Sequence, residues 1–211
     1  MPEPPTTRPV VAAFDVDGTL TTAECVVPFL RRAVGRRLVA ALARRPLELL
    51  RALARRDRDR LKELACTAFE GRDAAALDRL GAEFARTFVV PRLREDTTAR
   101  LRRHQELGHT VLLASASLEA YLRPLGAELE LDGVVCTRLE RGGDGRLTGN
   151  LLGANCRGPE KARRVLEWVT EAGLDGAELW AYGDSPGDAE LLAAADHPVR
   201  VDGVRLAPDL D

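Results

Sequence analysis

Several features that define other classes of protein are missing from this 211-residue sequence. No apolar run reaches the roughly 18 residues that a membrane-spanning helix needs, so no such helix is predicted. The four cysteines, at positions 25, 66, 136 and 156, are widely spaced and form no C-x-x-C pair. This spacing argues against a zinc site and against a disulfide framework. We therefore expect four reduced thiols in a cytoplasmic protein.

Lysine and aromatic residues are scarce as well. Lys62 and Lys161 are the only lysines among 31 basic residues, and aromatic residues make up 4% of the chain. Arginine cannot replace a compact ammonium at a tight site, so each retained lysine is informative. Residues 31–60 contain eleven arginines but no aromatic residue, and the net charge of the chain is -2. Binding to nucleic acid is therefore not predicted.

The composition, 45% hydrophobic and 30% charged, is typical of one compact domain with room for an inserted module. Residues 1–9 contain four prolines and are predicted to form a flexible leader, not a secretory signal. Apolar spacing is helical from residue 25 to residue 93, and strands and helices alternate beyond residue 97. We expect strands at 110–114, 133–140, 147–152, 178–182 and 199–201, and helices at 98–107, 118–125, 159–172 and 186–195.

This alternation predicts an α/β fold with a Rossmann-like, three-layer parallel sheet. Residues 10–20 and 96–211 are assigned to this α/β core, and residues 21–95 to an α-helical cap inserted after the first strand.

The most informative segment, residues 10–20, reads VVAAFDVDGTL. The short apolar run predicts a buried strand, whose carboxyl end opens where parallel sheets bind ligands. Asp15 and Asp17 project to the same side if the extended conformation continues through them. Two such carboxylates can hold a hard cation, or one can act as nucleophile and the other as proton donor. The alternative is a strand followed by an ordinary turn.

A second strand end, residues 111–117, reads VLLASAS and places Ser115 directly after a buried strand. Ser117 alternatively caps the helix that follows. In the segment GPEK, residues 158–161, the proline suits the start of a helix and Lys161 falls in its first turn. A cation there is slightly unfavourable unless an anion lies near, although an ordinary solvated lysine is the alternative.

A fourth segment, residues 178–188, reads ELWAYGDSPGD and leads from a strand into a helix. Asp184 leaves the strand at the same predicted edge as Asp15 and Asp17. Asp188 falls in the first turn of the helix, where compensation of the helix dipole also accounts for an acid. Three or four acids together repel one another, and a divalent cation relieves that repulsion.

In this order the four segments resemble the motifs of the haloacid dehalogenase superfamily. A cap between the first and second motifs resembles subfamily IB, the phosphoserine-phosphatase-like branch. The resemblance implies a Mg²⁺-dependent phosphomonoesterase that acts on a small-molecule phosphate monoester through an aspartyl phosphate. It implies that Asp15 is the nucleophile and Asp17 the general acid and base.

The resemblance also implies the remaining site residues. Ser115 and Lys161 are expected to bind the phosphoryl group. Mg²⁺ is expected on the carboxylates of Asp15 and Asp184 and on the backbone carbonyl of Asp17. Asp188 is expected to act through water or to orient Lys161.

The substrate is harder to predict. Glu24 occupies the position at which phosphoserine phosphatases carry a substrate-binding glutamate, so it is a candidate substrate contact. The arginine that binds the substrate carboxylate in those enzymes has no clear counterpart, because Arg58, Arg60 and Lys62 are out of register. Alanine and serine also replace paired glycines in the second motif. Phosphoserine is therefore not favoured.

Other functions stay open. A phosphotransferase can use the same intermediate, and residues 153–158, GANCRG, resemble phosphatidylglycerophosphatase-like members of the branch. A catalytically silent scaffold is the least favoured alternative. The arginines of residues 31–60 alternate with leucines, so this part of the cap can lie on an anionic membrane. A solvated face in an arginine-rich protein is the favoured interpretation.

Overall fold

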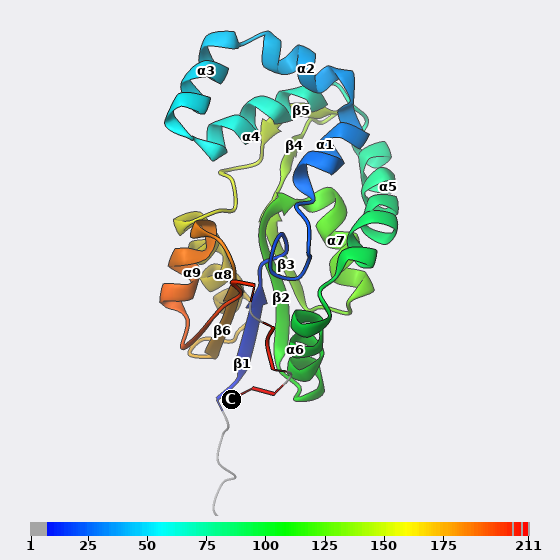
Figure 1. Ribbon diagram of the computed structural model, residues 1–211. Helices are drawn as coiled ribbons and strands as arrows, with labels where there is room; N and C mark the ends of the chain where they lie inside the picture. Colours follow the sequence, from blue (N-terminus) through cyan, green and yellow to red (C-terminus); the bar gives the residue numbers. More distant parts are fainter. Residues whose placement is uncertain (1–7, 204, 208, 211) are drawn as a thin grey trace, which may run out of the picture.

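The computed structural model describes residues 8–203, 205–207, 209 and 210. Five parallel strands form one sheet in the order β3-β2-β1-β6-β7 (Figure 1). The bounds in that order are Gly133–Thr137, Thr110–Leu118, Val10–Phe14, Glu178–Gly183 and His197–Arg200. Residues 1–7 of the predicted leader lie outside the described residues. The Pro9 carbonyl accepts a hydrogen bond from the Glu178 N–H at 2.8 Å.

Helices cover both faces of the sheet. Helices α6 (Glu95–Glu106) and α7 (Glu119–Glu128) lie on one face, and α8 (Pro159–Glu171) and α9 (Ala189–Ala194) lie on the other (Figure 1). Successive residues of β1 serve opposite faces: Phe14 joins the α6 and α7 cluster, and Ala13 joins the α8 and α9 cluster. The predicted three-layer α/β fold is confirmed.

The segment between β1 and α6 is mainly α-helical. Its helices are α1 (Val26–Val34), α2 (Arg36–Ala43), α3 (Pro46–Arg55), α4 (Arg58–Cys66) and α5 (Ala74–Phe84). In Figure 1, α1 to α4 lie beyond the carboxyl ends of the strands, and α5 runs beside α7. At the α5–α7 contact a Cβ on Gly81 would overlap the Ala120 carbonyl, so only glycine permits this approach. The limits assigned to core and cap stay a prediction.

The predicted strand at 133–140 is wrong as a single element. Strand β3 ends at Thr137, and residues 139–141 form β4 (Leu139–Arg141), which pairs antiparallel with β5 (Leu147–Leu151) in a separate sheet. The cause is the neighbouring strand, because β2 ends at Leu118, which is the partner of Thr137. Beyond Thr137, residues 139–141 have no neighbouring strand in the main sheet and pair with β5 instead.

Other bounds shift by a few residues. Strand β2 continues four residues past its predicted end at Ala114, because β3 pairs beside it. Helix α6 begins at Glu95, and the helix expected at 186–195 opens with a 3-10 turn, Pro186–Asp188. The last strand begins at His197, two residues earlier than predicted.

Two sequence features bear on location. The four cysteines are free and buried. Among the described residues no helix is both long enough and apolar enough to cross a membrane. The cytoplasmic location stays a prediction.

Candidate active site

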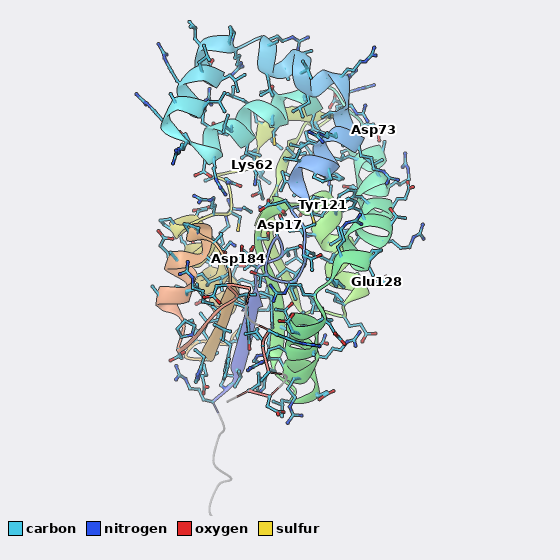
Figure 2. The ribbon with its side chains drawn as sticks, viewed as in Figure 1. Asp17, Lys62, Asp73, Tyr121, Glu128 and Asp184 are labelled. Carbon is cyan, nitrogen blue, oxygen red and sulfur yellow. The ribbon has the colours of Figure 1, made fainter. Side chains whose placement is uncertain are left out.

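The carboxyl ends of three neighbouring strands bring the predicted side chains together. Asp15 directly follows β1, and its N–H donates to the Tyr182 carbonyl of β6 at 2.9 Å. Asp184 directly follows β6, and Ser115 lies in β2 on the other side of β1. Because neighbouring parallel strands end at one edge, residues distant in sequence share one site. In Figure 2, Asp17 and Asp184 lie between this edge and Lys62 of α4.

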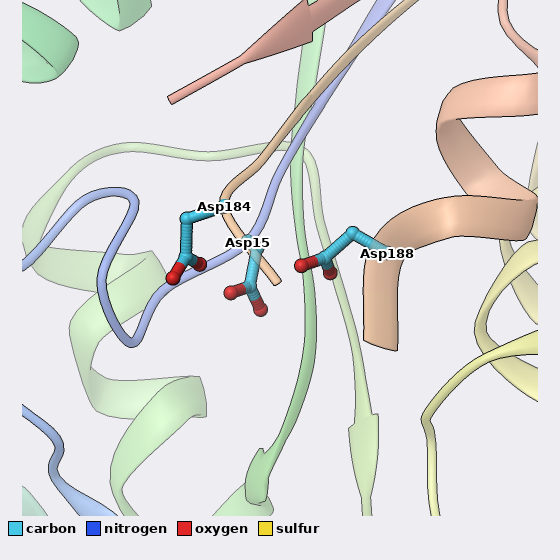
Figure 3. Close-up of side chains that lie close together, drawn as sticks. All are labelled: Asp15, Asp184 and Asp188. Carbon is cyan, nitrogen blue, oxygen red and sulfur yellow. The ribbon is translucent and has the colours of Figure 1, made fainter. Parts of the chain in front are cut away.

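Three carboxylates form the centre of this site. Asp15, Asp184 and Asp188 each offer an oxygen, and these oxygens lie within 4.8 Å of one another. Figure 3 shows the Asp15 carboxylate between the other two. Burial raises the pKa of Asp15 to about 7, although the nearby Lys161 acts in the opposite direction. An all-oxygen set of this size fits a hard cation such as Mg²⁺.

Lys161 supplies the positive charge that these acids need. Its Nζ lies 2.9 Å from Asp15 Oδ1 and also contacts Asp188 Oδ1. The side chain is 2% exposed, so the solvated alternative is wrong. Burial acts to lower the pKa of Lys161, but Asp15 and Asp188 outweigh it and raise the pKa. The other oxygen of Asp188 accepts hydrogen bonds from the N–H and hydroxyl of Ser185 at 3.0 and 2.8 Å. Asp188 thus does more than compensate a helix dipole.

Asp17 is held quite differently from Asp15. One carboxylate oxygen accepts the Cys25 N–H at 2.7 Å, and the other accepts the hydroxyl of Ser117. Neutral donors therefore engage both oxygens, and this carboxylate is not part of the three-acid cluster. Asp17 is also one of the residues that line the cavity described below.

Ser117 does not cap the helix that follows it, so that alternative is wrong. Residue 118 precedes α7 and no side chain caps this helix. Sequence reasoning missed the contact between Ser117 and Asp17. A signal was present, because Ser115 and Ser117 share one face of a strand that continues through both. The Ser115 hydroxyl accepts the Ser117 N–H at 3.2 Å, which leaves its own hydrogen free to donate.

The turn after Asp17 brings the backbone close to Asp184. Gly18 has a φ of +86°, and a Cβ there would overlap the Asp184 carboxylate. The next residue, Thr19, donates its hydroxyl to Asp184 Oδ1 at 3.1 Å. A glycine at this position therefore permits both the turn and the close approach.

A cavity of about 480 Å³ lies between the sheet edge and the helices α1 to α4. Asp15, Asp17, Ser115 and Lys161 are among its lining residues, together with Glu24, Arg58, Lys62, Asn155 and Arg157. Burial raises the pKa of Glu24, and Asp17 and Asp184 add to this effect. Arg60 instead pairs with Glu48 and Glu63. Of the three cationic candidates, two reach the cavity.

One contact between helix α4 and the core was not foreseen from the sequence. Lys62 Nζ donates to the Asn155 side-chain carbonyl at 3.0 Å and to the Ala116 carbonyl at 2.5 Å. Asn155 Nδ2 in turn donates to Asp59 Oδ1 at 2.6 Å. We call these contacts the Lys62–Asn155 bridge. The bridge holds α4 against the loop that leads to Lys161.

The sequence pattern of the haloacid dehalogenase-like hydrolases matches residues 12–193. The chain belongs to this family. Protein CicA of Caulobacter vibrioides is 35% identical over 190 residues, which cover 90% of this chain and 84% of CicA. Phosphoserine phosphatase SerB1 of Mycobacterium tuberculosis is 28% identical over 206 residues, which cover 94% of this chain and 67% of SerB1.

A solved structure shares the fold of this chain. A crystal structure of a protein with unknown function from Bordetella pertussis Tohama I matches with a TM-score of 0.76 and 26% identity. That match covers 92% of this chain and 90% of the other. The predicted haloacid dehalogenase-like family and the predicted phosphatase class are confirmed. The roles of individual residues stay predictions.

Proposed function

We propose that this haloacid dehalogenase-like phosphatase hydrolyses a small-molecule phosphate monoester with Mg²⁺ through an aspartyl phosphate on Asp15. One observation carries the proposal: Asp15 and Asp17 line the same cavity but have opposite surroundings. Asp15 is buried and ion-paired with Lys161, whereas neutral donors hold Asp17. Two carboxylates in unlike environments suit two different tasks, nucleophile and acid.

Substrate binding is assigned to Lys161 and Ser115. The Lys161 ammonium is fixed between two carboxylates, and the Ser115 hydroxyl keeps a free hydrogen. Both groups line the cavity and can donate to phosphoryl oxygens beside Asp15. Donors that are fixed before the substrate arrives stabilise developing charge without reorganisation. Glu24 stays the candidate for contact with the rest of the substrate.

The chemical step uses the two acids in turn. Asp15 attacks phosphorus in line, and the bond to the leaving alcohol oxygen breaks as Asp17 donates a proton to that oxygen. Asp17 is then ionised and accepts a proton from the water that attacks the aspartyl phosphate. Asp15 is regenerated and inorganic phosphate leaves.

A divalent cation fits the acids that this mechanism places near the phosphoryl group. The carboxylates of Asp15 and Asp184 and the backbone carbonyl of Asp17 would hold Mg²⁺. The Asp17 carboxylate is engaged by other donors, and Asp188 orients Lys161. When bound, the cation neutralises phosphoryl charge and orients the phosphoryl group.

Phosphate release from para-nitrophenyl phosphate and from a panel of phosphate monoesters tests the proposal, with Mg²⁺ and with EDTA. We expect turnover that needs Mg²⁺ and that is lost in Asp15→Asn with the fold intact by circular dichroism. Acid-quenched enzyme should carry phosphate on Asp15, and Asp17→Asn should accumulate it from an aryl phosphate. Continued phosphate release by folded Asp15→Asn would refute the mechanism, and no release from any ester would favour a silent scaffold.

A further inference from the structure

The cavity above Asp15 has two unlike parts. The part at the sheet edge is polar and contains the two acids, Ser115 and Lys161. The part formed by the helical segment is largely aliphatic, although Arg58 and Lys62 of α4 also line the cavity. Its wall includes Leu30, Leu38, Leu42, Leu49, Leu53 and Leu61, which come from four helices, α1 to α4.

The chemistry fixes which end of a substrate faces this wall. Phosphorus must lie against Asp15 and Lys161, which hold the polar end. The leaving oxygen must face Asp17, on the cavity side of the cluster. The rest of the leaving alcohol then extends away from the sheet edge toward the leucine wall, in a cavity that Glu24 and Arg58 also line.

We infer that the natural substrate is a phosphate monoester whose alcohol carries an aliphatic chain, joined directly or through a short polar linker. The inference rests on the proposed function and names the substrate class for it. A small polar alcohol such as serine occupies only the polar part and leaves the leucine wall without a partner. An aliphatic chain instead buries apolar surface along that wall, which favours binding in proportion to the area covered.

The wall also continues to the surface. Val27 and Leu53 line the cavity and are 51% and 53% exposed. On the same helix as Leu53, Leu50 is 62% exposed and Leu47 is 67% exposed. A chain longer than the cavity can therefore leave it over apolar side chains, so chain length is not limited by a closed end.

A series of n-alkyl phosphates from ethyl to dodecyl, each kept below its micelle concentration, tests the inference, with phosphoserine and glycerol phosphate as polar references. We expect kcat/KM to rise by about two- to fourfold per methylene group until the wall is covered. Equal or better turnover of the polar references would overturn the inference. Para-nitrophenyl phosphate separates the two failures: turnover of this ester without a chain-length effect refutes only the aliphatic substrate.

Two leucines of α3 provide a matched pair of variants. Leu49 lines the cavity and is partly buried, whereas Leu47 is exposed and does not line it. Leu49→Gln should flatten the chain-length dependence, and Leu47→Gln should retain it. If Leu49→Gln does not fold, the wild-type series still decides. An equal effect of both substitutions would contradict the cavity as the binding site.

Binding can be read without turnover in Asp15→Asn. Calorimetric titration with the same alkyl phosphates should give tighter binding and a more negative heat-capacity change with each added methylene group. A heat-capacity change that does not vary with chain length would count against the inference.

A phosphate monoester with an aliphatic chain can reach the enzyme as a free monomer or as part of a lipid surface. Dodecyl phosphate is therefore assayed as monomer and in phosphatidylcholine vesicles. A chain-length preference with monomers supports the cavity as its source. If longer chains are preferred only in vesicles, the preference arises from binding to the vesicle surface and the inference is overturned.

Discussion

The hydroxyl of Ser117 donates a hydrogen bond to the carboxylate of Asp17, 100 residues earlier in the chain. Ser117 lies near the end of β2 and is fully buried, whereas Asp17 is half-buried and lines the cavity. Together with the Cys25 N–H, the Ser117 hydroxyl fixes both oxygens of the proposed general acid. Ser117 is thus a positioning residue, which acts on the reaction through Asp17.

Ser117→Ala should impair substrates according to their leaving group. Alkyl phosphates need a proton on the leaving oxygen, so we expect their kcat to fall by about tenfold, a part of the usual general-acid contribution. Para-nitrophenyl phosphate, whose leaving group departs readily without a proton, should lose much less. Ser117→Thr keeps the hydroxyl and should restore part of the loss. A uniform loss with both substrate types would point to a structural role alone.

Lys161→Met should destabilise the fold as well as stop turnover. The change removes the cation between Asp15 and Asp188, two carboxylates with 8% and 1% side-chain exposure. Breaking such a buried pair leaves uncompensated charge, and we expect the free energy of unfolding to fall by about 3 kcal/mol.

The control is Arg163→Met in the same helix. Arg163 is 54% exposed and pairs with Glu160 at 2.8 Å on the surface. Its loss should change the free energy of unfolding by less than about 0.5 kcal/mol. Urea denaturation without Mg²⁺ measures both variants. If both variants lost the same free energy of unfolding, the buried ion pairs of Lys161 would contribute no more to stability than a surface ion pair.

Asn155→Ala should loosen α4 from the core. The Asn155 side chain contacts Lys62, Asp59 and Thr137, so its removal breaks the Lys62–Asn155 bridge. We expect the free energy of unfolding to fall by about 2 kcal/mol, because the buried Thr137 and the half-buried Lys62 each lose a hydrogen-bond partner. KM should rise more than kcat falls, since the cavity wall moves and the two acids do not.

Hydrogen exchange of the α4 amides reports this loosening directly. Asn150→Ala is the matched control, because Asn150 is exposed and bonds to Glu140 at 3.2 Å, away from the cavity. Unchanged exchange in α4 after Asn155→Ala would show that the bridge does not hold the helix.

Gly18→Ala should weaken Mg²⁺ binding. The new Cβ would overlap the Asp184 carboxylate and displace a proposed ligand, so we expect affinity to fall by about 10- to 100-fold. Gly173 has a similar φ, +72°, with nothing within 4 Å of its would-be Cβ. Gly173→Ala should therefore cost stability but leave Mg²⁺ affinity unchanged. Calorimetric titration with Mg²⁺ measures the affinity of both variants. An equal loss of affinity in both would assign the effect to backbone strain and not to displacement of Asp184.

Stability should depend on pH through His104. Its Nε2 lies 2.8 Å from the Tyr182 hydroxyl, and burial, followed by His109, lowers its pKa to about 3. The unfolded chain binds a proton near pH 6.5 and the folded protein does not. As the pH is lowered below about 6.5, the free energy of unfolding should therefore decrease, by up to about 1.4 kcal/mol per pH unit.

His104→Gln should flatten this slope between pH 7 and pH 5. Chemical denaturation at several pH values provides the comparison. We expect the free energy of unfolding to decrease as the pH falls, because the folded state of a histidine with a lowered pKa does not take up the proton that the unfolded chain binds. An identical slope in the variant would assign the pH dependence to other groups.

The sequence alone predicted much of the scaffold. Strand β1 and the starts of α8 and β6 lie where the apolar runs and the proline at position 159 indicated. These elements depend on local periodicity and on backbone constraints of single residues. The order of the motifs along alternating strands and helices was also enough to place Asp15 and Asp184 at one sheet edge.

Only the tertiary structure decided which side chains meet. Nothing local distinguishes Arg58, which lines the cavity, from Arg60, which pairs with Glu48 and Glu63 on α3 and α4. The split of residues 133–140 and the partner of Ser117 likewise depend on where β2 ends and what lies beside it. Burial and hydrogen-bond partners come from segments far apart in the chain, so a local pattern determines the elements but not these contacts.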